Sequence, residues 1–101
     1  MYTMVKGVAQ SADFTSDIFQ VGQLDYVQFY CEAISGGTIA FQGSTDNVVW
    51  NDLDATNLSL TATGFRSARL GNLYIRAEGT GTAAVTDVFI SGPHVEFFAD
   101  A

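Results

Sequence analysis

Positively charged residues are scarce in this chain of 101 residues. Lysine and arginine together number four, against eleven aspartate and glutamate residues, and the formal net charge at pH 7 is −7. A protein binds nucleic acid largely by neutralising phosphates with basic side chains, and only Lys6, Arg66, Arg69 and Arg76 could do so. We therefore expect no nucleic-acid partner. The negative charge also disfavours adsorption to anionic membranes.

Cysteine is nearly absent, since Cys31 is the single one and cannot form an internal disulfide. Val27, Phe29 and Cys31 share one parity, so we expect Cys31 to be a small buried hydrophobic residue rather than a reactive thiol. No apolar run approaches the ~20 residues of a membrane span, and no signal-peptide pattern opens the chain. These features predict a soluble protein, made in a cytoplasm, with no membrane partner.

The motifs of common hydrolases and metalloenzymes are also missing. The chain has no G-x-S-x-G and no H-E-x-x-H, and its single histidine, His94, has no accompanying Ser/Asp motif. Carboxylates are plentiful, but a glycosidase needs a pair of them in a cleft, one with a raised pKa. We therefore predict that the protein is not an enzyme, with no catalytic residue and no cofactor.

Charged residues make up 15% of the chain, against about 25% in average globular domains. A thinly charged surface is typical of a subunit that is partly covered by copies or partners, although sugar-binding and antigen-like β-modules also favour neutral polar surfaces. The length corresponds to one domain, residues 1–101. Within it we expect an N-terminal arm at residues 1–12 and a C-terminal tail at residues 94–101.

Short segments with a two-residue hydrophobic period recur between turn-forming residues, and no segment keeps a helical period over several turns. This pattern predicts an all-β fold, an antiparallel β-sandwich or jelly roll. Residues 2–9 are expected to form a strand or an arm that pairs with a neighbour, and residues 65–70 a connection. The other expected strands are 18–21, 25–33, 38–42, 48–53, 56–63, 72–79 and 83–92, before the alternating segment 94–101.

We expect a hairpin over residues 37–53. Ile39 begins an alternating strand, residues 43–47 are turn formers, and a second apolar run starts at Val48. The expected core anchors are Phe41, Trp50 and Leu53. Because Trp50 and Leu53 have opposite parity, burying both requires a bulge or a strand end between them.

Oxygen-bearing side chains gather in and after this turn, at Asp46, Asn47, Asn51, Asp52 and Asp54. They could hold Ca²⁺ if backbone carbonyls completed a shell of six to eight ligands. They lack the spacing and the glycine of an EF-hand, so we favour turn formation and strand capping and predict no metal site.

Aromatic residues fall opposite the apolar faces of the expected strands. They could cap sheet edges, or be buried by the opposite sheet if the parity is reversed, or form a contact surface suited to protein partners and to stacking on sugar rings. Residues 83–92 are apolar on both parities, so either this strand is central with both faces covered, or its second face meets another molecule. Arg66 and Arg69 could anchor a partner's carboxylates or pair with the chain's own. The predicted interface residues are Tyr26, Tyr30, Tyr74, Arg76, Phe89 and Phe98.

Two segments carry a resemblance to a known family. GTIAFQGSTDNVVWNDL precedes a polar-alternating strand and then LYIRAEGTGTAAVTDVFISG. Over residues 35–92 this order resembles small β-sandwich modules of tailed-bacteriophage virions, which are similar to discoidin-like carbohydrate-binding sandwiches. The matching positions are Gly43, Ser44, Asp46, Trp50, Leu53, Tyr74, Ile75, Arg76, Gly79 and Gly81.

The resemblance implies an architectural function. It suggests a capsid decoration (cement) protein that binds the outside of a phage head, stabilises capsomer contacts and is made in the host cytoplasm. Its partners would be the major capsid protein and copies of itself, as a trimer. The alternative is a carbohydrate- or receptor-binding module of a phage tail or fibre, with a glycan as ligand. A third reading is a stress or adaptor domain of the host.

Overall fold

A computed structural model describes residues 2–5, 13–32, 34–35, 37–53, 59–62, 64–80, 84–85 and 87–100. Every element in these ranges is a β-strand, and all strand pairs are antiparallel. The described part of the chain contains no helix long and apolar enough to cross a membrane.

A four-stranded sheet forms one layer, in the order β1 (Tyr2–Val5), β11 (Val88–Ser91), β4 (Asp25–Cys31) and β8 (Gly64–Leu70). A six-stranded sheet forms the other layer. Its order is β12 (Val95–Ala99), β3 (Ile18–Val21), β9 (Leu73–Thr80), β6 (Thr38–Ser44) and β7 (Asn51–Asp52), and β2 (Phe14–Thr15) also pairs with β9. A small ladder joins β5 (Ile34–Ser35) to β10 (Ala84–Val85).

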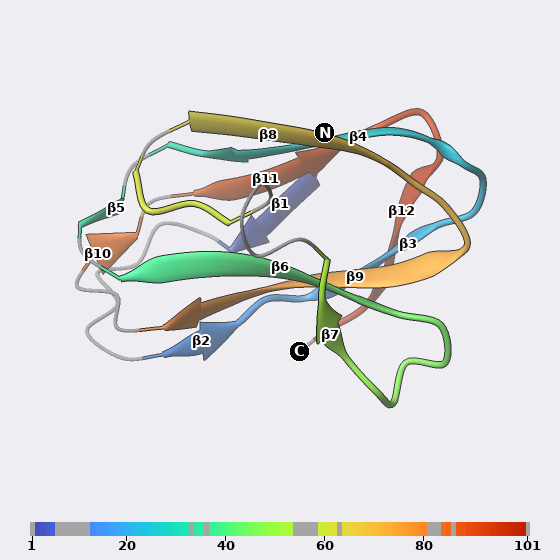
Figure 1. Cartoon of the computed structure of the whole chain (residues 1–101), viewed down its shortest axis with the longest axis horizontal. Helices are drawn as coiled ribbons and strands as arrows, with labels where there is room; N and C mark the ends of the chain where they lie inside the picture. The colour runs from blue at the N-terminus through green and yellow to red at the C-terminus, as the bar shows by residue number, and fades with distance from the viewer. Residues whose placement is uncertain are drawn as a thin grey trace.

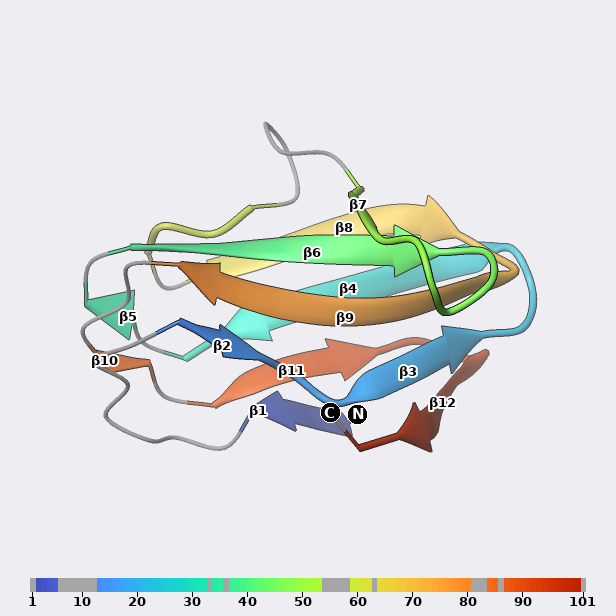
Figure 2. The same ribbon diagram turned by 90° about the horizontal axis from the view of Figure 1, so that it is seen from below.

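The two larger sheets lie face to face, which confirms the predicted all-β antiparallel sandwich (Figure 1). In the view onto the six-stranded sheet, β8 lies on the same side of the molecule as β6 and β7, and β1 lies on the same side as β12 (Figure 2). The two edges of the sandwich therefore consist of different strands.

Inward-facing side chains of the two sheets meet in one core. The rings of Phe29 on β4 and Phe41 on β6 stack with centroids 4.1 Å apart. Phe41 is buried as predicted, and Leu53 is partly buried against the core. Cys31 is also buried, as expected for a small hydrophobic residue. The core residues are Met4, Phe19, Val21, Val27, Phe29, Cys31, Ile39, Phe41, Leu60, Ile75, Ala77, Val88, Ile90 and Val95.

Trp50 is not a core anchor, and this prediction was wrong. The hairpin exists, but its second strand, β7, comprises only Asn51 and Asp52. Val48 and Val49 lie in the loop with 76% and 61% of their surface exposed, and Trp50 is half-buried outside the core. Hydrogen bonds to Asp46 hold these residues in the loop, so the β-branched pair does not join the sheet.

The segment 65–70 is not a connection, because residues 64–70 form β8 and pair with β4 along its whole length. Of the expected strand 56–63, residues 56–58 and 63 lie outside the described ranges, and Leu60 forms a single bridge to Ile39. Residues 83–92 include β11, which lies between β1 and β4. Val88 and Ile90 are buried in the core, but Phe89 lies on the outer face and is only half-buried, so the described chain does not cover both faces of this strand.

The expected terminal segments contribute strands to the sheets of their own chain. β1 pairs with β11, and β12 pairs with β3. Residues 6–12 of the predicted arm lie outside the described ranges.

Candidate functional site

Three aromatic side chains form a row across the outer face of the four-stranded sheet. Tyr30 on β4 lies opposite Phe89 on β11 and opposite Phe65 on β8. Its ring stacks on both neighbours, with centroid distances of 4.4 Å to Phe65 and 6.0 Å to Phe89. We call Phe65, Tyr30 and Phe89 the aromatic row. Because Phe65 is 57% exposed, the row presents apolar surface to solvent.

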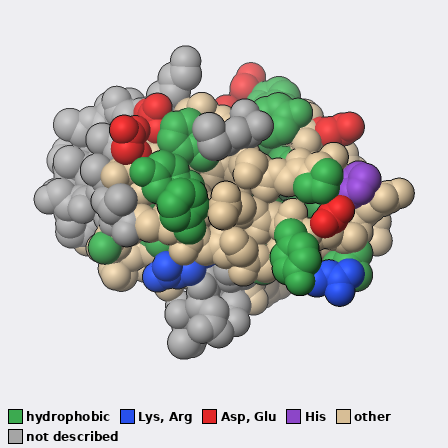
Figure 3. All heavy atoms as spheres, turned by 90° about the horizontal axis from the view of Figure 1, so that it is seen from above, with side chains coloured by type: hydrophobic (Ala, Val, Ile, Leu, Met, Phe, Trp, Pro, Cys, Tyr) green, Lys and Arg blue, Asp and Glu red, His purple; other side chains and the backbone are tan. Residues whose placement is uncertain are grey.

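Basic side chains lie beside the aromatic row on β8. The guanidinium of Arg69 lies 5.8 Å from the centroid of the Tyr26 ring, and Tyr26 is 66% exposed. Arg66 donates a hydrogen bond from Nη1 to the carbonyl oxygen of Phe65 at 2.8 Å. Figure 3 looks onto this face and shows hydrophobic side chains gathered on it, with basic side chains along one margin. The face thus combines aromatic surface with cationic groups at one edge.

A second cluster lies on the outer face of the six-stranded sheet, around Arg76 on β9. Its guanidinium carbon is 4.4 Å from the centroid of the Trp50 ring. Nε donates to Oε1 of Gln42 at 2.8 Å, and Nη2 lies 4.0 Å from Oε2 of Glu78. The amide of Gln42 in turn donates to Asp52 Oδ1 at 3.2 Å. These contacts hold the guanidinium over the indole, as in a cation–π pair.

Tyr74 and Phe98 extend this second cluster, since their rings meet edge to face at 4.7 Å. The structure therefore divides the predicted interface residues between two faces. Tyr26, Tyr30 and Phe89 lie on the outer face of the four-stranded sheet, and Tyr74, Arg76 and Phe98 belong to the other cluster. Sequence reasoning missed Phe65 and Trp50 as surface residues. For Phe65 the available signal was its parity with Ser67 and Arg69.

Asp46 organises the loop between β6 and β7. Its Oδ1 accepts hydrogen bonds from the backbone N–H groups of Val49 and Val48 and from the hydroxyl of Ser44, at 2.9–3.0 Å. The N–H of Val49 and then that of Val48 are the largest causes that lower the pKa of Asp46 below its ordinary value. Asn47 has φ of 61°, which asparagine tolerates. The carboxylate of Asp46 thus stabilises the turn, which is the role that we favoured over calcium binding.

The structure describes only part of the residues considered for calcium, because Asp54 lies outside the described ranges. Within those ranges, no group of three or more His, Cys, Asp or Glu side chains is arranged to hold a metal ion.

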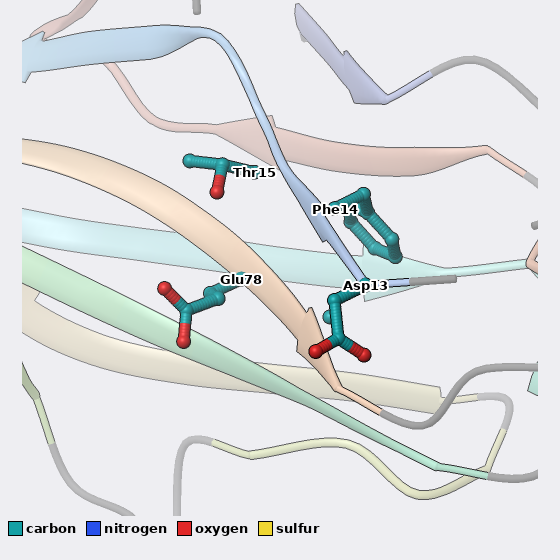
Figure 4. A pocket seen from close by; sticks show the side chains of 5 residues that line it. Asp13, Phe14, Thr15 and Glu78 are labelled. Carbon is teal, nitrogen blue, oxygen red and sulfur yellow. The ribbon is translucent and has the colours of Figure 1, made fainter.

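An open hollow of about 260 Å³ lies beside β2, lined by Asp13, Phe14, Thr15, Glu78 and Gly79. Figure 4 shows the carboxylates of Asp13 and Glu78 on the same side, with the Phe14 ring directed away from them. A Cβ atom at Gly79 would overlap that ring, so glycine lets β2 pack closely on β9. Among the residues that the structure describes, the lining offers two carboxylates and a hydroxyl and includes no histidine, cysteine or basic group.

Comparisons of the chain with models of protein families, with curated proteins and with solved structures gave no match.

Proposed function

We propose that this chain is a non-enzymatic structural protein of a phage virion. It is a capsid decoration protein that binds the outer surface of the head through the outer face of its four-stranded sheet. The aromatic row carries the proposal, because three stacked rings lie on a solvent-facing sheet surface instead of in the core. The resemblance of residues 35–92 to virion modules is the reason for proposing a phage capsid as the partner.

The geometry of the row suits strong docking at low entropic cost. A sheet face is rigid, and the ring stacking already orders the side chains, so little freedom is lost when a partner covers them. Burying one exposed aromatic side chain contributes about 1.5–3 kcal/mol. Aromatic and arginine residues also dominate the energetics of protein interfaces.

The chemistry of this face defines its partner. The major capsid protein would present an apolar patch to Tyr30, Phe65 and Phe89. Copies of this chain, assembled as a trimer, would then stabilise contacts between capsomers.

Cosedimentation with capsids of the encoding phage tests the proposal, using both mature and unexpanded heads. We expect saturable binding at a stoichiometry matched to lattice sites, and capsids that better resist heating after binding. Absence of binding to both capsid forms would refute the decoration function.

A second candidate function is favoured by the Arg76 cluster. Trp50, Tyr74 and Phe98 lie with Gln42 and Asp52 on one face, which combines ring surfaces with hydrogen-bonding groups. Such a combination suits sugar rings, which stack on aromatics and bond through their hydroxyls. Under this alternative the chain is a glycan- or receptor-binding module of a phage tail or fibre. Glycan binding that is lost in Trp50→Ala, without capsid binding, would favour it.

A further inference from the structure

Strands β8 and β12 each lie at an edge of one of the two large sheets, whose opposite edges are β1 and β7. Within the described chain, β8 has β4 as its only strand partner, and β12 has only β3. Figure 2 shows the two strands at opposite sides of the sandwich, β8 on the side of β6 and β7 and β12 on the side of β1. The outer side of an edge strand offers backbone N–H and C=O groups to a further strand.

The two edges carry opposite charge. β8 contains Arg66 and Arg69 and no carboxylate, although the whole chain has a net charge of −7. β12 and the residue after it contain Glu96 and Asp100, both exposed, and no basic residue. A basic edge and an acidic edge on one chain are complementary between copies, whereas either edge repels its own kind.

Both edges also expose aromatic surface. Phe65 on β8 is 57% exposed, and Phe97 and Phe98 on β12 are 50% and 43% exposed. Strand pairing between these edges would cover apolar rings as well as backbone groups. Edge strands that expose both features invite pairing with another strand.

We propose that β8 of one copy pairs with β12 of a second copy, which joins the four-stranded sheet of one subunit to the six-stranded sheet of the next. In an antiparallel register, Arg69 lies opposite Glu96 of the partner subunit. Arg69 shares its strand face with Phe65, and Glu96 alternates with buried Val95, so both side chains point away from the core. The joined sheet therefore brings the two charges together on its outer face.

The contact is head-to-tail, because each copy uses a different edge for each neighbour. Such a contact builds a ring when its rotation closes. The trimer in the proposed function is a ring of this kind. The role of this ring on a capsid rests on the proposed function. The strand pairing itself is inferred from the charge and exposure of the two edges, and it can be tested on the purified protein.

Charge reversal at each edge tests the pairing. The basic-edge variant carries Arg66→Glu and Arg69→Glu, and the acidic-edge variant carries Glu96→Arg and Asp100→Arg. By light scattering, we expect an oligomer for the unmodified chain and a single chain mass for each variant. The combined variant, with all four substitutions, has the net charge of the unmodified chain and should regain the oligomer.

A matched control changes charge away from both edges. Asp13→Arg with Glu32→Arg alters the net charge as much as the acidic-edge variant does, at two other exposed positions. This control should remain oligomeric. Far-ultraviolet circular dichroism should show the same β-structure in every variant.

Three results would overturn the inference: an unmodified chain that is monomeric, an oligomer that survives either edge variant, or a combined variant that stays monomeric. Capsid cosedimentation of the same proteins separates this inference from the proposed function. A monomeric chain that binds capsids would refute the strand pairing alone, and an oligomer that does not bind capsids would refute the decoration function alone.

Discussion

At the scale of single residues, hydrogen bonds to Asp46 place the apolar residues Val48 and Val49 in an exposed loop instead of a strand. Its carboxylate accepts three hydrogen bonds from the loop and from the end of β6. These bonds favour the charged form and lower the pKa. A carboxylate with a lowered pKa in the folded state stabilises that state above its ordinary pKa, and this contribution is lost as the pH falls through the lowered value.

We therefore predict that the side chain of Asp46 titrates with a midpoint below the ordinary value of 3.8. The measurement is a carboxyl-carbon NMR titration, and the amide signals of Val48 and Val49 should move with the same midpoint. In Asp46→Asn this amide titration should disappear. A midpoint at or above 3.8 would contradict the bonding of the loop.

Gly79 allows the close approach of β2 to β9. A Cβ atom there would overlap the ring of Phe14, and overpacking of this kind costs about 1–3 kcal/mol. Gly79→Ala should therefore lower the free energy of unfolding by that amount in urea denaturation. Gly22→Ala is the matched control, because its Cβ would meet nothing within 4 Å. Equal losses in the two variants would contradict this packing.

At the scale of elements, strand β8 carries both an exposed aromatic ring, that of Phe65, and two basic side chains. Phe65→Ser removes the most exposed ring of the aromatic row and should leave the fold intact, since the ring lies outside the core. If a capsid buries this ring, the loss of about 1.5–3 kcal/mol weakens binding roughly 10- to 100-fold. Capsid cosedimentation at graded concentrations measures the change.

Val48→Ser is the control for this prediction. Val48 is also exposed, but it belongs to the β6–β7 loop of the other sheet. Capsid binding should be unchanged in this variant. If both variants bind like the unmodified chain, the aromatic row is not the docking surface.

At the scale of the whole molecule, stability depends on the stacked rings that join the two sheets. Phe41→Ala should lower the free energy of unfolding by about 3–5 kcal/mol, a large share of the 5–15 kcal/mol typical of a domain. Trp50→Ala should cost only about 1–2 kcal/mol, because it removes a surface cation–π contact. Urea denaturation measures both, and a larger loss for Trp50→Ala would restore Trp50 as a core anchor.

The sequence alone predicted the fold class and the strands with clear alternation. Ile39 with Phe41, and Val27 with Phe29, mark strands because a two-residue period puts apolar side chains on one face wherever one face is buried. Of the predicted core anchors, Phe41 is fully buried and Leu53 packs against the core. The parity of Tyr26, Tyr30 and Phe89 left open whether they are buried or form an outer surface, and the structure puts them on the outer face of the four-stranded sheet.

Two features depended on the tertiary structure, and a third depended on local hydrogen bonds that hydrophobic periodicity does not reveal. β8 alternates only weakly in hydrophobicity, and its pairing with β4 makes it a strand. Trp50 lies on the surface because side-chain hydrogen bonds to Asp46, which periodicity does not detect, form the loop before it. The order of the strands divided the predicted interface residues between two faces and put a basic and an acidic edge on opposite sides. Local sequence determines which face a side chain occupies, but contacts distant in sequence decide which faces and edges meet.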